Sequence, residues 1–158
     1  MPNNKLLVYS ETVYKAFPHF FREKSAMKFL IAEDDLLSRR ILKELLALYG
    51  DCDIAVNGQE AIDSFRLAHD AKRPYDMICM DVLMPVADGM AALQSIRAME
   101  KKMAIPPQLA VKVIMTTALN DPRTVIKSFN QCEADAYIVK PLSRSKLLKE
   151  LRVLKLVP

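Results

Sequence analysis

The sequence predicts an α/β domain built on a five-stranded, parallel, doubly wound sheet. Short apolar runs of strand length alternate with amphipathic stretches of helical period, and this alternation repeats five times within residues 27–158. The strand-like runs are apolar almost throughout, which is typical of parallel strands that carry helices on both faces. Most of these runs also end directly at a residue that can do chemistry.

Each element is indicated by its own stretch of sequence. The expected strands are Phe29–Ala32, Asp53–Val56, Tyr75–Met80, Ala110–Met115 and Ala136–Val139. The expected helices carry Leu37, Ile41, Leu45 and Leu48; Ala61, Ile62, Phe65 and Leu67; Met90, Leu93 and Ile96; Val125, Ile126 and Phe129; and Leu147, Leu148, Leu151 and Leu154. Gly50 is expected to end the first helix, and Asp121 and Ser143 to cap the last two. Right-handed crossovers leave few ways to wind such a chain, so we expect the flavodoxin-like strand order 2-1-3-4-5 with five helices.

Composition excludes several classes of protein. The chain has 158 residues, of which 27% are charged, and a formal net charge of +4. No apolar run approaches the roughly 20 residues that span a bilayer, and no signal pattern opens the chain, so we expect a cytoplasmic protein without membrane contact. The basic residues form no cluster, which argues against nucleic acid as a partner. Cys52, Cys79 and Cys132 are interpreted as reduced thiols, and His19 and His69 as surface residues.

Residues 1–26 lie outside the repeating pattern, which divides the chain into an extension and a domain over residues 27–158. Leu6–Tyr9 can form a strand, and Phe17, Phe20 and Phe21 form an aromatic cluster in the sequence. Met27 stands just before the first core strand, so one hypothesis is that translation begins there. The alternative is a genuine docking arm or linker.

Chemistry-bearing residues follow four of the five expected strands. Glu33-Asp34-Asp35 follow the first strand, Asp81 the third, Thr116-Thr117 the fourth and Lys140 the fifth. Because the carboxyl ends of parallel strands meet at one edge of the sheet, these groups are expected to converge. Gathered carboxylates repel one another, and a divalent cation relieves this repulsion; an all-oxygen ligand set suits Mg²⁺. Lys140 adds a positive charge that can meet a phosphoryl oxygen.

The order of these motifs resembles one family. Glu33-Asp34-Asp35 after an apolar strand, then Asp81 through Pro85 to Asp88-Gly89, then Thr117-Ala118, then Lys140-Pro141, are together similar to the response-regulator receiver domains of two-component signalling. The resemblance covers roughly Met27 to Leu154. Each motif alone is weak, whereas all four in order, each at its own strand end, are specific.

The resemblance implies a role for each site residue. Asp81 resembles the acceptor of a phosphoryl group from a phosphohistidine, Asp34 the direct Mg²⁺ ligand and Glu33 a ligand that often acts through water. The backbone carbonyl of Leu83 would be a further ligand. Thr117 and Lys140 resemble the pair that binds the phosphoryl group, and Tyr137 the aromatic switch residue.

Several of these residues have a simpler interpretation. Asp35 and Asp88 are expected as helix N-caps, Thr116 as a strand residue, Pro85 and Gly89 as loop-shaping residues, and Met77, Met80 and Met115 as core. Tyr137 can also be an ordinary half-buried strand aromatic.

The family implies a signalling module rather than an enzyme. Phosphorylation would draw Thr117 and Lys140 inward, let Tyr137 turn, and change the affinity of a face formed by the fourth helix, fifth strand and fifth helix for a protein partner. A homodimer through that face is possible. The donor would be a sensor histidine kinase or a histidine phosphotransfer protein. Leu83 and Leu119 flank the acceptor site in this family and cannot hydrogen-bond water, so slow loss of phosphate is expected. The alternative function is a receiver-like scaffold that binds without phosphorylation.

Overall fold

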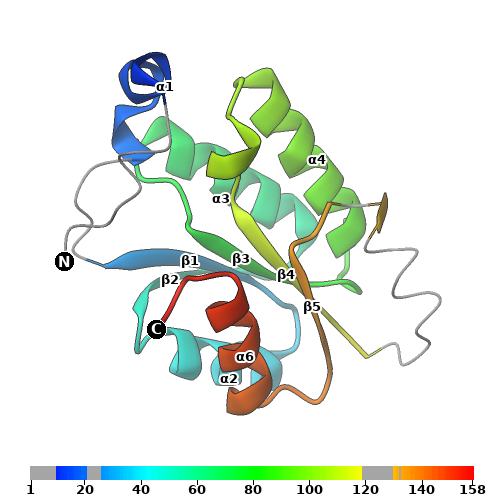
Figure 1. Cartoon of the computed structure of the whole chain (residues 1–158). Helices are drawn as coiled ribbons and strands as arrows, with labels where there is room; N and C mark the ends of the chain where they lie inside the picture. The colour runs from blue at the N-terminus through cyan, green and yellow to red at the C-terminus, as the bar shows by residue number, and fades with distance from the viewer. Residues whose placement is uncertain (1–9, 21–25, 119–129, 132) are drawn as a thin grey trace.

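The computed structural model describes residues 10–20, 26–118, 130–131 and 133–158. Five parallel strands form one sheet in the order β2-β1-β3-β4-β5, which confirms the predicted winding (Figure 1). The elements in chain order are α1 (Glu11–Ala16), the 3-10 helix η2 (Pro18–Phe20), β1 (Met27–Ala32), α2 (Leu36–Leu46), β2 (Gly50–Ala55), α3 (Gly58–Asp70), β3 (Met77–Asp81), α4 (Gly89–Lys102), the 3-10 helix η3 (Pro107–Leu109), β4 (Lys112–Thr117), β5 (Ala136–Val139) and α6 (Arg144–Val153).

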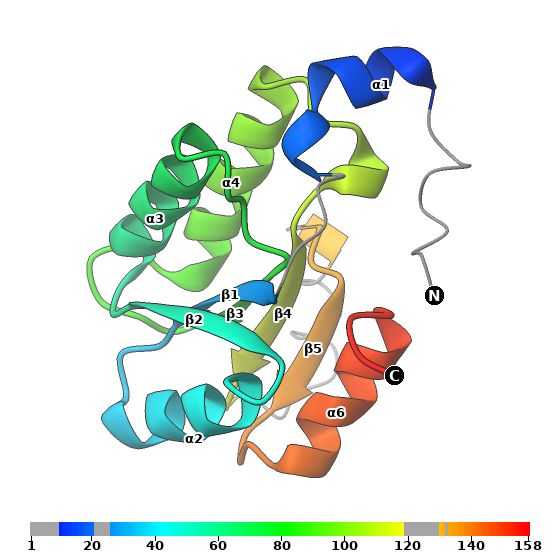
Figure 2. The same ribbon diagram turned by 90° about the vertical axis from the view of Figure 1, so that its left-hand side faces the viewer.

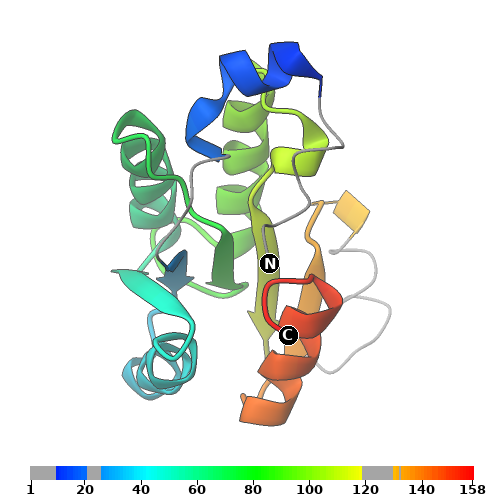
Figure 3. The same ribbon diagram turned by 60° about the vertical axis from the view of Figure 1, so that its left-hand side comes forward.

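The sheet separates two apolar cores, one on each face. Helices α3 and α4 cover one face, where Phe65, Leu93 and Ile96 are fully buried against the strands (Figure 2). Helices α2 and α6 cover the other, and there Leu46 and Leu151 are fully buried (Figure 3). Both faces of the strands are therefore apolar, and all five residues of β3 are buried. This is the physical reason that the strand sequences lack polar alternation.

Four helices of the doubly wound unit begin at a side chain that accepts a hydrogen bond from the backbone three residues on. The caps and their donors are Asp35 with Ser38, Asn57 with Glu60, Asp88 with Ala91, and Ser143 with Lys146. The cap predictions for Asp35, Asp88 and Ser143 are confirmed. Each cap satisfies an amide that the first helical turn leaves without an internal partner. Asp35 and Asp88 cap the helices that follow β1 and β3 in the chain.

The predicted core stripe of the first helix is wrong in part. In α2 the fully buried residues are Leu42 and Leu46, whereas Leu37 is 68% exposed and Leu48 is 65% exposed. Leu37 lies about 140° around the helix axis from Leu42, because each residue turns the helix by about 100°, and Leu48 lies in the turn after α2. The helix carries a wider apolar arc than the sheet covers, and spacing alone does not show which part of the arc is buried.

Two smaller predictions are corrected in the same region. Gly50 does not end a helix but begins β2, so the second strand is longer than predicted and starts three residues earlier. In α3, Leu67 is 62% exposed, and Ala68 takes the core position instead. The fourth predicted helix, with Val125, Ile126 and Phe129, lies outside the described residues, as do Leu6–Tyr9, Phe21, Leu119 and Cys132.

The described part of the N-terminal extension lies against the α3–α4 layer (Figures 1 and 2). The ring of Phe20 is 6.0 Å from that of His69, which in turn is 4.5 Å from the ring of Phe65 in α3. Phe17 packs edge-on to Phe20 at 6.1 Å. The interpretation of His69 as a surface residue is therefore wrong, because the imidazole is half-buried between two aromatic rings.

Among the helices that the structure describes, none is both long enough and apolar enough to cross a membrane.

Candidate phosphoacceptor and metal site

Three carboxylates meet at the carboxyl edge of the sheet. Glu33 and Asp34 follow β1, Asp81 ends β3, and their nearest carboxylate oxygens all lie within 4.8 Å of one another. Glu33 is fully buried and Asp81 is 6% exposed, whereas Asp34 is exposed. The cluster is therefore a buried acid pair with a third acid at the mouth, open to solvent. The convergence predicted from the strand ends is confirmed for these three residues.

The ammonium of Lys140 lies between two of these acids. Its Nζ atom is 3.1 Å from Oδ2 of Asp81 and 2.9 Å from Oε2 of Glu33. Among the described residues Oε2 of Glu33 has no hydrogen bond of good geometry, so its contact with Lys140 is chiefly ionic. Lys140 leaves β5 at the same edge, two strands away from Asp81, and its backbone amide donates to Thr117 O at 2.7 Å.

The charges of this cluster perturb one another. Burial is the main reason that the pKa of Glu33 lies above its ordinary value; Lys140 opposes this shift, and the Asp81 carboxylate adds to it. Burial also acts to lower the pKa of Lys140, but the contacts with Glu33 and Asp81 outweigh it, so the pKa of Lys140 is raised. One lysine ammonium therefore contacts two of the three acids of the cluster, Glu33 and Asp81.

The loop after Asp81 is fixed by two glycines. Gly89 packs against the backbone carbonyl of Asp81, and Gly58 packs against that of Ala87; a Cβ at either position would overlap the carbonyl. The amide of Gly58 donates to Ala87 O at 3.0 Å, and that of Gly89 to Val82 O at 2.9 Å. The loop-shaping role predicted for Gly89 is confirmed, whereas that of Gly58 was not foreseen. Together these close contacts fix the position of the loop that follows Asp81.

Leu83 lies in this loop beside the acceptor carboxylate. Its backbone amide is 3.4 Å from Oδ1 of Asp81, a long hydrogen bond, and its side chain is 59% exposed. Val86 in the same loop is 84% exposed, so two apolar side chains of this loop face solvent.

Strand β4 brings two threonines to the same edge. Thr116 pairs in register with Asp81, and Thr117 with Val139; both are fully buried. Within the described residues the hydroxyl of Thr116 has no hydrogen-bond partner, in keeping with its interpretation as a strand residue. Tyr137, in β5, packs against the α3–α4 core, and its hydroxyl oxygen is inaccessible to solvent.

Arg39 is a site residue that sequence reasoning missed. Its Nη1 atom donates to Glu33 O at 2.9 Å and to Asp34 O at 3.2 Å, so it clamps the backbone that carries both acids. The only available signal was an arginine in the first turn of the following helix, which is too common to be specific. Asp35 is confirmed as the N-cap of α2 and does not belong to the acid cluster.

The three acids suit a hard divalent cation. Carboxylate oxygens are the ligands that Mg²⁺ prefers, and a single exposed acid at the mouth leaves room for the waters that Mg²⁺ retains. A divalent cation would also add positive charge to a cluster in which Lys140 contacts only Glu33 and Asp81.

Comparison with known proteins gives the family. Residues 29–152 match the family described as the response regulator receiver domain. A probable transcriptional regulator, ycf27, of Cyanophora paradoxa is 34% identical over 133 residues, which cover 84% of this chain and 49% of that protein. The chain thus spans about half the length of this curated relative.

Solved structures agree with this match. In the CheX–CheY–BeF3–Mg complex from Borrelia burgdorferi, a chain with 25% identity superposes with a TM-score of 0.69 over 84% of this chain and 90% of its own length. A structure of the Saccharomyces cerevisiae phosphotransfer protein Ypd1 with the receiver domain of Ssk1 matches at 25% identity with a TM-score of 0.68, covering 82% of this chain and 88% of that chain. The sheet order, the matched residues and these relatives lead to one conclusion: the chain belongs to the response regulator receiver family of two-component and phosphorelay signalling.

Proposed function

We propose that Asp81 accepts a phosphoryl group from a phosphohistidine of a sensor kinase or histidine phosphotransfer protein. The observation that carries the proposal is the contact of Asp81 with Lys140 at 3.1 Å beside the acids Glu33 and Asp34. A carboxylate oxygen of Asp81 attacks phosphorus, the new O–P bond forms as the P–N bond breaks, and the electron pair of that bond leaves on the imidazole nitrogen. The product is an acyl phosphate.

Mg²⁺ bound by Glu33, Asp34, Asp81 and the Leu83 carbonyl would neutralise charge on the transferred phosphoryl oxygens. The chain supplies the remaining interactions. Lys140 is held next to Asp81, so its ammonium can turn from the carboxylate to a phosphoryl oxygen with little movement. The Thr117 hydroxyl is the second proposed donor, and the backbone bond from Lys140 to Thr117 couples the two strand ends.

The buried hydroxyl of Tyr137 supports a switch role for this residue. An added phosphoryl group brings up to two negative charges to the carboxyl edge of the sheet, and movement of Thr117 toward it changes the packing beside β5. The output is a changed affinity of a protein-binding face that includes β5 and α6. In the solved complex of Ypd1 with the Ssk1 receiver the partner is a phosphotransfer protein, which supports a donor or recipient of that class here.

Incubation with acetyl phosphate and Mg²⁺, followed by intact-mass analysis, tests the proposal. The wild-type chain is expected to gain one phosphoryl group, and Asp81→Asn to gain none. Asp88→Asn is the matched control, because Asp88 caps α4 at the end of the same loop and has no place in the acid cluster.

A gain of mass that persists in Asp81→Asn would refute Asp81 as the acceptor. If neither protein gains mass while another receiver does so in parallel, the chain is a phosphorylation-independent scaffold.

A further inference from the structure

Helix α6 and the residues beside it carry more basic side chains than the internal contacts of the fold engage. Residues 141–158 hold five basic residues against one acid, Glu150; the basic residues are Arg144, Lys146, Lys149, Arg152 and Lys155. Two of them stand in the first helical turn, where the helix dipole disfavours cations and where α6 has no acidic residue. Helix stability therefore does not account for this pattern.

Only part of this charge is committed to internal contacts. Lys146 donates to the carbonyls of Val139 and Pro141 at 2.9 and 3.0 Å, and Arg152 donates to Pro158 O at 2.9 Å. Arg144 and Lys149 are exposed, and no ion pair among the described residues includes either of them. Two cations are thus left facing solvent, five residues or about 1.4 helical turns apart along α6.

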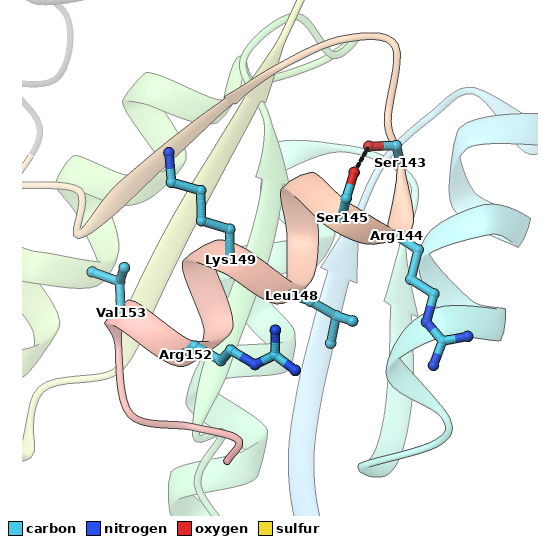
Figure 4. A pocket seen from close by; sticks show the side chains of 7 residues that line it. All are labelled: Ser143, Arg144, Ser145, Leu148, Lys149, Arg152 and Val153. Carbon is cyan, nitrogen blue, oxygen red and sulfur yellow. Dashed lines mark hydrogen bonds between the residues drawn. The ribbon is translucent and has the colours of Figure 1, made fainter.

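These cations border an open hollow with an apolar floor. The hollow has a volume of about 860 Å³ and is lined by Ser143, Arg144, Ser145, Leu148, Lys149, Arg152 and Val153 (Figure 4). Val153 is 65% exposed. A second, narrower crevice shares Arg144 and Leu148 with the hollow. It continues to Leu45 near the end of α2 and to Leu48 and Tyr49 in the turn that follows. The exposed Leu48, in the turn after α2, therefore adds an apolar side chain next to this surface.

We propose that this α6 face binds an acidic, amphipathic peptide segment of a partner protein. Leucine or aromatic side chains of the partner would cover Leu148, Val153 and Leu48, and its carboxylates would pair with Arg144 and Lys149. The inference extends the proposed function, because it gives the chemistry of a partner, but the binding it describes does not require phosphorylation.

Charge and burial favour a protein over other anionic partners. An amphipathic helix enters a membrane surface by its apolar side, but the apolar side of α6 is taken up by the core, where Leu147 and Leu151 are buried. A nucleic acid backbone would leave Leu148 and Val153 exposed to water, since it offers phosphates and no apolar groups to cover them.

The test selects a displayed library of random twelve-residue peptides on the wild-type protein, with counter-selection on Arg144→Glu/Lys149→Glu. The control variant Lys72→Glu/Lys102→Glu makes the same change of charge at exposed lysines on other elements. Enriched peptides are expected to be rich in Asp, Glu, Leu and Phe. The most enriched peptide, labelled with fluorescein, should bind Arg144→Glu/Lys149→Glu about tenfold more weakly than wild type, and the control variant unchanged.

Neutral or basic enriched peptides would overturn the proposal, as would equal binding by both double variants. So would binding of phosphatidylserine vesicles or duplex DNA to this face in place of acidic peptides. Mass gain from acetyl phosphate, measured on the same variants, is expected to stay normal, which separates failure of this inference from failure of the phosphoacceptor assignment.

Discussion

The Nζ atom of Lys140 lies 3.1 Å from Oδ2 of Asp81, so the carboxylate proposed to attack phosphorus is already paired with a cation. The same ammonium contacts Glu33 at 2.9 Å. One lysine therefore holds together acids from two strands, and in doing so it occupies space close to the proposed metal. A metal ion bound there would compete with Lys140 for the same negative charge.

Replacing Lys140 with Gln is expected to tighten Mg²⁺ binding. Removing a positive charge a few ångströms from the cation relieves a repulsion of about 1 kcal/mol at a partly exposed site, which corresponds to about a fivefold lower Kd. Isothermal titration calorimetry measures the change. Lys112→Gln removes the same charge at the opposite end of the sheet, where Lys112 pairs with Asp135, and should bind Mg²⁺ like wild type. Equal or weaker binding by Lys140→Gln would contradict the arrangement.

Asp34→Asn is expected to remove most of the stabilisation that Mg²⁺ gives. A ligand that binds only the folded state raises the free energy of unfolding by about 2.7 kcal/mol at one hundred times its Kd. Asp34 is the exposed acid of the cluster, so its loss would remove a proposed ligand without disturbing the buried pair. Thermal unfolding with and without Mg²⁺ measures the effect, and Asp63→Asn on α3 is the control. A Tm rise equal to that of wild type would exclude Asp34 as a ligand.

Sequence reasoning located the acids and the lysine because strand ends carry positional information. In a parallel sheet every strand ends at the same edge, so Asp81 and Lys140 could be placed together although 59 residues separate them. The burial of Leu42 in place of Leu37 could not be derived, because it depends on how α2 is rotated over the sheet. The clamp of Arg39 on Glu33 and Asp34 depends on one rotamer and leaves no pattern in the sequence.

Leu83→Asn is expected to speed loss of the phosphoryl group from Asp81. Leu83 is 59% exposed beside Asp81 and would shield an acyl phosphate there, whereas an amide can hydrogen-bond an attacking water. One such bond of about 1.4 kcal/mol corresponds to about a tenfold faster rate. Intact mass followed over time after removal of acetyl phosphate gives the rate, with Val86→Asn in the same loop as the control. An unchanged half-life would show that Leu83 does not shield the acyl phosphate from water.

Tyr75→Phe is expected to destabilise the protein in a pH-dependent way. The Tyr75 hydroxyl donates to Asp53 at 2.7 Å. Burial would raise the pKa of Asp53, but the bonds from Tyr75 and Lys28 outweigh it and hold the pKa below its ordinary value of 3.8. A depressed carboxyl pKa stabilises the fold above the unfolded value and loses this contribution as pH falls through the folded value.

The loss in Tyr75→Phe should therefore be about 1 kcal/mol at pH 7, and the gap to wild type should narrow below about pH 4. Urea unfolding at a series of pH values measures it. Tyr14→Phe, in the N-terminal extension, is the control. A gap that stays constant down to pH 3 would mean that the bond to ionised Asp53 contributes nothing.

The buried ion network around Arg97 should be the most sensitive point outside the site. Arg97 is 8% exposed and contacts Glu100 at 2.7 Å and Asp135 at 3.1 Å; it also donates to the carbonyls of Val111 and Glu133. These contacts join α4 to the starts of β4 and β5, and Glu100 in turn accepts from the Val111 amide at 2.7 Å. Removing one partner leaves the others buried without compensation.

Arg97→Met is expected to lower the free energy of unfolding by about 3–5 kcal/mol, because it strands the Glu100 carboxylate in the interior. Urea denaturation at neutral pH measures the loss. Arg66→Met removes an exposed arginine that pairs with Asp63 on α3, and should cost no more than about 0.5 kcal/mol. Adding Glu100→Gln to Arg97→Met should recover part of the loss, since it removes the stranded charge. If Arg97→Met costs no more than Arg66→Met, the network contributes specificity rather than stability.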